Sequence, residues 1–173
     1  SVATNVVSAT PVEWIECFIS DGGSLVGLTD TIEISVNNES LLGGLFFEIE
    51  DFPDVLVGES VLTTERTDGW SLSILDDNGK ISIAGFGPLA GADPLQPGDG
   101  PVCRVVVRPQ GDQSLTVSLT MTDVQIQDIS SPPVQLNWTS EPGVYEVGIE
   151  TQFIMLTDGS AAPGAQMNSS MCL

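Results

Sequence analysis

The chain has 173 residues and a mass of 18.2 kDa, enough for one domain with its own core and too little for two. Its 24 acidic side chains face only four basic ones, and the formal net charge of −20 argues against nucleic acid or an anionic membrane as a partner. Histidine is absent, which excludes Ser-His-Asp and Cys-His catalysis and imidazole metal ligands. No apolar run approaches the ~20 residues of a membrane-spanning helix, so we expect no membrane insertion.

Alternating apolar and polar residues predict β-strands along most of the chain. At 13–20 the alternation places Cys17 on an inward face, and Asp21-Gly22-Gly23 ends this strand. Asn78-Gly79 is the expected tip of a hairpin, because both residues tolerate a positive φ. The segment 55–64 predicts either a short strand pair or one bent strand. Further strands are predicted at 31–36, 44–50, 70–75, 81–86, 102–108, 114–127, 134–138, 144–149 and 153–156.

The spacing of the turn residues predicts an all-β sandwich or barrel, because helical periodicity is absent. Residues 88–101 are dense in Gly, Pro and Asp and predict a loop, and residues 157–173 predict a tail. Without an internal repeat or linker, we expect one domain at 12–150, an N-terminal arm at 1–11, and a C-terminal strand and tail at 151–173. If Ser1 is the natural start, a leader has been removed and the protein is exported. The boundary of an expressed fragment is the alternative.

Four segments resemble cohesin modules in order and spacing. The run G-G-L-F-F-E-I-E-D-F-P-D-V-L at 43–56 resembles the cohesin segment in which a Gly-aromatic strand leads into an acidic, Pro-containing bend. I-S-I-A-G-F at 81–86, followed by L-Q-P-G-D-G-P-V at 95–102, is similar to the cohesin strand, loop and Gly-x-Gly entry into the next strand. Residues 115–129, with Asp123 and Asp128, resemble the late strand and its acidic turn, and G-V-Y-E-V at 143–147 resembles the closing strand.

The resemblance covers roughly residues 13–148 and carries expectations about fold and function. It implies a jelly-roll β-sandwich of about nine core strands, to which this chain adds terminal strand extensions. It also implies a secreted, non-catalytic protein in which one sheet face binds a dockerin. The chain contains no dockerin-like calcium repeat D-x-[DN]-x-D-G, so it is not its own ligand.

The cysteines and the glycosylation motifs give candidate modification sites. Cys17, Cys103 and Cys172 allow one disulfide and one remaining thiol, with all three pairings open. Cys17 and Cys103 alternate with apolar neighbours, so each is alternatively a small buried hydrophobe. The N-x-[ST] motif occurs at Asn38, Asn137 and Asn168, and Asn38 is expected to lie in a turn.

Acidic and aromatic residues suggest three further kinds of site, each with a simpler reading. Glu48 and Glu50 share a strand face and could form a glycosidase pair, but solvated face residues are the preferred interpretation. We expect no cofactor; a structural calcium ion is an alternative, since Asp residues recur in the loops at 76–78, 93–99 and 123–128. The tryptophans Trp14, Trp70 and Trp138 could stack on a glycan, with Trp70 expected to be the most exposed, or could pack in the core. Zinc is not expected, because no CxxC occurs.

These observations lead to a main hypothesis and an alternative. In the main hypothesis the protein is an extracellular structural subunit that binds identical subunits head to tail, through terminal strand exchange, in a filament or surface layer. The segments expected at that interface are uncharged or apolar: Val2, Thr4, Val6, Val7, Phe153, Ile154, Met155 and Leu156. The alternative is a monomeric cohesin-type module that binds a dockerin-like protein or a glycan. Neither hypothesis includes catalysis.

Overall fold

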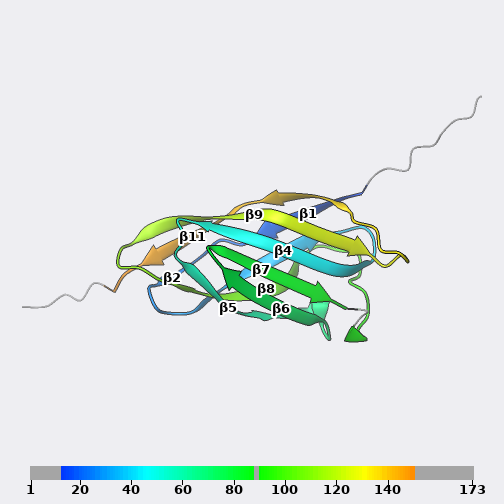
Figure 1. Ribbon diagram of the computed structural model, residues 1–173, viewed down its shortest axis with the longest axis horizontal. Helices are drawn as coiled ribbons and strands as arrows, with labels where there is room; N and C mark the ends of the chain where they lie inside the picture. The colour runs from blue at the N-terminus through cyan, green and yellow to red at the C-terminus, as the bar shows by residue number, and fades with distance from the viewer. Residues whose placement is uncertain (1–12, 88–89, 151–173) are drawn as a thin grey trace, which may run out of the picture.

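The computed structural model describes residues 13–87 and 90–150, which form two β-sheets packed face to face (Figure 1). In these ranges the chain has eleven strands and one short 3-10 helix. The strand order is β10-β1-β3-β8-β5 in the five-stranded sheet and β2-β11-β9-β4-β7-β6 in the six-stranded sheet. The elements are β1 (Trp14–Ile19), β2 (Gly22–Leu25), β3 (Asp30–Asn37), β4 (Leu42–Phe52), β5 (Leu56–Leu62), η1 (Glu65–Thr67), β6 (Ser71–Asp77), β7 (Lys80–Phe86), β8 (Pro101–Pro109), β9 (Leu115–Asp128), β10 (Asn137–Glu141) and β11 (Gly143–Gly148). The predicted jelly-roll β-sandwich is confirmed.

The core lies between the sheets and is built by the alternation visible in the sequence. Every second side chain of a strand points to the same face of its sheet, so one apolar set per strand is buried. In β3 this set is Ile32, Ile34 and Val36, each with no exposed surface. Full burial of such a side chain stabilises the fold by about 1.5–3 kcal/mol, so the shared apolar phase of the strands holds the sheets together.

The backbone passes from the five-stranded sheet to the six-stranded sheet between β1 and β2 and also between β10 and β11. β1 pairs in parallel with β10 in the five-stranded sheet, and β2 pairs in parallel with β11 in the six-stranded sheet. The chain changes sheets between β1 and β2, where the Asp21 carboxylate accepts a hydrogen bond of 2.8 Å from the Val144 amide. β1 begins and β11 ends at opposite ends of the sandwich (Figure 1).

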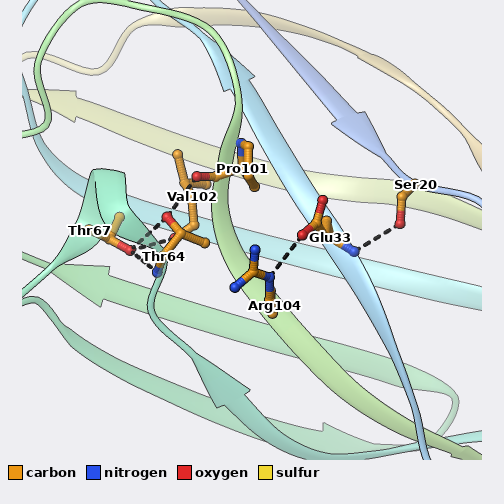
Figure 2. Close-up of polar contacts among 7 residues, drawn as sticks. All are labelled: Ser20, Glu33, Thr64, Thr67, Pro101, Val102 and Arg104. Carbon is orange, nitrogen blue, oxygen red and sulfur yellow. Dashed lines mark hydrogen bonds and ion pairs between the residues drawn. The ribbon is translucent and has the colours of Figure 1, made fainter.

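The helix η1 is fastened to β8 by two threonines, and the sequence patterns did not predict it. The Thr64 hydroxyl donates to the Pro101 carbonyl at 2.7 Å, and the Thr67 hydroxyl donates to the Val102 carbonyl at 2.8 Å (Figure 2). The Thr64 amide in turn donates to the Thr67 hydroxyl oxygen at 3.0 Å. This turn lacks an apolar period because its contacts are polar, and for that reason a hydrophobicity pattern does not reveal it.

Three other local expectations can be compared with the structure. The hairpin at 78–79 is confirmed, with φ of 54° at Asn78 and 74° at Gly79. The segment 55–64 contains the single strand β5, whose register shifts between Gly58 and Ser60. The strand predicted at 134–138 instead begins at Asn137, because the Asp128 carboxylate accepts the amides of Ser130 and Val134 and holds a turn there.

Candidate functional site

The outer face of the six-stranded sheet carries a grid of side chains from β9, β4, β7 and β6. We call this surface the grid face. The pairing register fixes four rows across the strands. In order β9, β4, β7, β6 the rows are Thr120–Glu50–Lys80–Asp77, Asp123–Glu48–Ser82–Leu75, Gln125–Phe46–Ala84–Ser73 and Gln127–Gly44–Phe86–Ser71.

One half of the grid face is acidic. Its first two rows hold four carboxylates and a single ammonium group. The Glu48 carboxylate accepts hydrogen bonds from the Lys80 ammonium at 2.6 Å and from the Thr122 hydroxyl at 2.7 Å, and these bonds lower the pKa of Glu48. Its negative charge is therefore retained at neutral pH, and the half as a whole presents excess negative charge to solvent.

The other half of the grid face carries no charged side chain in its two rows and combines aromatic residues with Gln, Ser and small residues. Phe46 is half-buried between Gln125 and Ala84, and Phe86 is 40% exposed. Leu75, on the edge strand β6 at the end of the row that contains Glu48, adds an apolar side chain that is 64% exposed. Apolar side chains next to small ones such as Ala84 offer a partner surface that can be desolvated at little cost, as at the centre of protein interfaces.

The outer face of the five-stranded sheet has two of its carboxylates paired with arginines of the same chain. Arg104 lies 2.8 Å from the Glu33 carboxylate, and the Glu33 backbone amide donates a hydrogen bond to the Ser20 hydroxyl oxygen at 2.9 Å (Figure 2). Arg108 pairs with Glu59 at 2.5 Å on the neighbouring strands. This face therefore has two carboxylates neutralised by arginines, whereas the grid face has one carboxylate paired with a lysine.

Sequence reasoning did not single out the grid face, although its signal is present in β4. Leu45 and Phe47 are buried in the core, so Phe46 between them points to the outer face, where the alternation would normally place a polar residue. The same holds for Leu75 and Phe86. Their neighbourhood follows from the strand register, which one sequence does not give.

Glu48 and Glu50 both lie on the grid face, in agreement with the interpretation that they are solvated face residues. Asp51, which follows them in the sequence, points away from this face and is buried. Asp51 is 2% exposed, and one carboxylate oxygen accepts the amides of Val55 and Leu56, both at 2.8 Å. Its other oxygen is buried without a hydrogen-bond partner. Burial raises the pKa of Asp51. Its contacts are those of a residue that closes the turn after β4.

The predicted cysteine and asparagine sites have different outcomes. Cys17 and Cys103 are buried and are not bonded to each other in the described structure, so of the three pairings only those with Cys172 stay predictions. Asn38 is 3% exposed, its side-chain amide donates to the carbonyls of Ser40 and Gln96, and its glycosylation stays a prediction. Asn137 is exposed on β10. Cys172 and Asn168 lie outside the described residues.

The tryptophans do not form a common stacking surface. Trp70, expected to be exposed, is 6% exposed, and its indole N–H donates to the Asp93 carbonyl at 2.9 Å. Trp138 packs partly buried against the core, and Trp14 is 59% exposed on β1. A glycan-binding platform built from the three rings is therefore contradicted.

Several predictions concern residues that the structure does not describe. The expected interface residues at 2–7 and 153–156 lie outside the described ranges, so terminal strand exchange stays a prediction. Within residues 13–87 and 90–150, no three acidic or cysteine side chains gather as metal ligands. No helix in these ranges is long and apolar enough to cross a membrane.

Comparison with known proteins gives matches at the level of structure. No family model matches the chain, and no curated protein matches it in sequence. A non-cellulosomal cohesin from Archaeoglobus fulgidus superposes with a TM-score of 0.63 at 15% identity, over 80% of this chain and 94% of that chain. The type I cohesin–dockerin complex Coh-OlpC-Doc435 from Clostridium thermocellum gives 0.63 at 12% identity, over 82% of this chain and 98% of that one. The seventh ScaB type I cohesin from Pseudobacteroides cellulosolvens gives 0.63 at 14% identity, over 81% and 96%.

These similarities extend over most of each chain at low identity, so they establish the architecture. The two-sheet architecture agrees with the β-sandwich that the four sequence segments implied. In fold, the chain is a cohesin-like module.

Proposed function

We propose that this chain is an exported, non-catalytic recognition module that binds a dockerin-like protein on the grid face. The observation that carries the proposal is the combination of a cohesin-like fold with a sheet face whose exposed apolar residues lie beside unneutralised carboxylates. Two of the similar structures are described as cohesin–dockerin complexes, from Clostridium thermocellum and Acetivibrio cellulolyticus. This supports a protein partner over a glycan.

Strand exchange between identical subunits has less support. A net charge of −20 on every copy opposes close approach of two copies, most strongly at low ionic strength. The four basic side chains cannot relieve this repulsion, because each is already engaged within its own chain. A different protein with complementary charge meets no such barrier.

The test is binding of the full chain to the dockerin-like modules of the source genome, recognised by their paired calcium-binding repeats. Calorimetry in calcium is expected to find at least one that binds below about 1 μM. Ala84→Arg places a long cation at the centre of the grid face and should weaken that binding about a hundredfold. Thr31→Arg adds the same charge to an exposed position of the five-stranded sheet and should leave binding unchanged.

Two results would contradict the proposal. The first is that no dockerin-like module of the source binds at 50 μM. The second is equal affinity of the Ala84→Arg and Thr31→Arg variants when both keep the circular dichroism of the parent chain. Equal weakening by the two would indicate general electrostatics in place of a defined face.

A further inference from the structure

A small apolar notch adjoins the grid face where β4 begins and β9 ends. It has a volume of about 180 Å³ and is walled by Gly43, Phe86, Ile129 and Pro133. Apolar cavities of ~150 Å³ lined by aliphatic and aromatic residues hold a molecule as large as benzene. The notch therefore has room for one large apolar side chain.

The notch stays open because of a glycine. A Cβ at Gly43 would lie 3.2 Å from the Asp128 carbonyl oxygen and 3.5 Å from the Ile129 side chain, so any larger residue would project into the wall. Phe86 and Ile129 keep 40% and 49% of their surface exposed, and a bound side chain would cover that surface.

Asp128 holds the wall of the notch in place. One of its carboxylate oxygens accepts hydrogen bonds from the amides of Ser130 and Val134 and from the Ser130 hydroxyl, at 3.0, 2.8 and 2.6 Å. These three bonds close the turn that carries Ile129 and Pro133. A site ordered before binding loses less conformational entropy when its partner arrives.

Charge identifies the chemistry of the occupant. The chain has only four basic side chains. Lys80, Arg104 and Arg108 pair with glutamates, and Arg66 donates to backbone carbonyls and to Asn38. The chain therefore has no unengaged Lys or Arg to offer a partner, whereas its carboxylates on the grid face are largely uncompensated. An approaching surface gains from Lys or Arg of its own.

We infer that the notch is the anchor site of the grid face, and that it takes one large apolar side chain from a segment in which Lys or Arg flank that side chain. This inference rests on the proposed function, because the notch continues the row Gln127–Gly44–Phe86–Ser71 of the same face. A second copy of the chain does not fit the description, since its net charge is −20.

The inference can be tested with peptides that need no known partner. The probes are three N-acetylated peptide amides, Lys-Arg-Leu-Lys-Arg, the same peptide with Ser in place of Leu, and Glu-Glu-Leu-Glu-Glu. Each is titrated into the 15N-labelled full chain, and amide shifts are followed. Only the Leu-containing cationic peptide should move the amides of Gly43, Phe86 and Ile129 together.

Two variants locate the effect. Ile129→Ser removes an apolar wall and should weaken the cationic Leu peptide about tenfold, as expected for losing part of one buried side chain. Val134→Ser is the matched control, because Val134 is 52% exposed in the same turn and does not line the notch. Its affinity should equal that of the parent chain.

Each contrary result overturns the inference in a distinguishable way. Equal shifts from the Leu and Ser peptides would show that charge alone binds them. Notch shifts that appear only after deletion of residues 1–12 or 151–173 would show that the chain's own segment is the occupant, and a doubled mass in sedimentation would show a second copy. A dockerin-like module that binds the parent and Ile129→Ser equally would refute the anchor and leave the proposed function standing.

Discussion

Replacing Arg66 with alanine tests how the loop before β8 is held. The Arg66 guanidinium reaches from η1 across to β3 and to the loop at 96–100, and it makes five hydrogen bonds. Its acceptors are the carbonyls of Val36 (2.6 Å), Gly100 (3.0 Å), Gln96 (3.1 Å) and Gly98 (3.1 Å) and the side-chain oxygen of Asn38 (2.6 Å). One side chain thus connects three segments that are distant in sequence.

The expected loss follows from how many of these acceptors lose access to water. The bonds to Val36, Gly100 and Asn38 are partly buried, whereas those to Gln96 and Gly98 are exposed. Water can replace Arg66 at the exposed carbonyls, so these two bonds contribute little. The three partly buried bonds contribute about 1 kcal/mol each. We therefore expect Arg66→Ala to lower the free energy of unfolding by about 3 kcal/mol.

The measurement is urea-induced unfolding followed by tryptophan fluorescence, supported by thermal melts. A loss of about 3 kcal/mol corresponds to a fall of about 6–12 °C in Tm for a domain of this size. Arg104→Ala is the matched control, because its ion pair with Glu33 joins side chains that are 46% and 39% exposed. Such a pair contributes about 0–1 kcal/mol. If the two variants lose the same stability, the reasoning about buried acceptors is refuted.

Three further predictions concern single positions in the sandwich. Gly79→Ala should cost about 1–2 kcal/mol in urea unfolding, because φ is 74° there and a Cβ would lie 2.9 Å from the Asp54 carboxyl carbon; an unchanged midpoint would argue against this turn. Burial raises the pKa of Cys17 and of Cys103 to about 12. In a Cys172→Ser chain, neither thiol should therefore react with a maleimide at pH 8 until urea is added. A maleimide adduct found by mass spectrometry of the native protein would contradict this expectation. Burial raises the pKa of Asp51 above its unfolded value. The folded state therefore binds a proton more readily than the unfolded state, and the free energy of unfolding falls as the pH rises through the folded pKa. Relative to Asp51→Asn, the parent chain should gain stability when the pH is lowered from 7 to 4, and a difference in stability that does not depend on pH would contradict the shift.

The sequence predicted those parts of the fold that depend on apolar period and turn chemistry. In β3 the alternation of Ile32, Ile34 and Val36 is enough to define a strand with one buried face. Asn78-Gly79 is enough to define its turn, because few residue pairs adopt two consecutive positive φ values. Both signals are local, and the structure leaves them unchanged.

The remaining features depend on contacts between segments that are distant in sequence. Trp70 follows Asp68-Gly69 and has the local pattern of an exposed residue, yet Asp93 supplies a carbonyl for its indole and the ring is buried. Asn38 has a turn-like neighbourhood, yet Arg66 and Gln96 enclose it. A local pattern cannot anticipate a partner that lies tens of residues away.

The candidate site belongs to this second class, since the grid face exists only through register. A shift of one residue in the pairing of β4 with β7 would exchange the inward and outward sets of side chains and bury Glu48 in the core. The same pairing that excludes this arrangement therefore brings Phe46 next to Ala84 and Glu48 next to Ser82 on the outside. The core and the grid face are two consequences of one register. For that reason a substitution on the grid face can change binding while leaving the apolar core, and with it the stability of the sandwich, nearly unaffected.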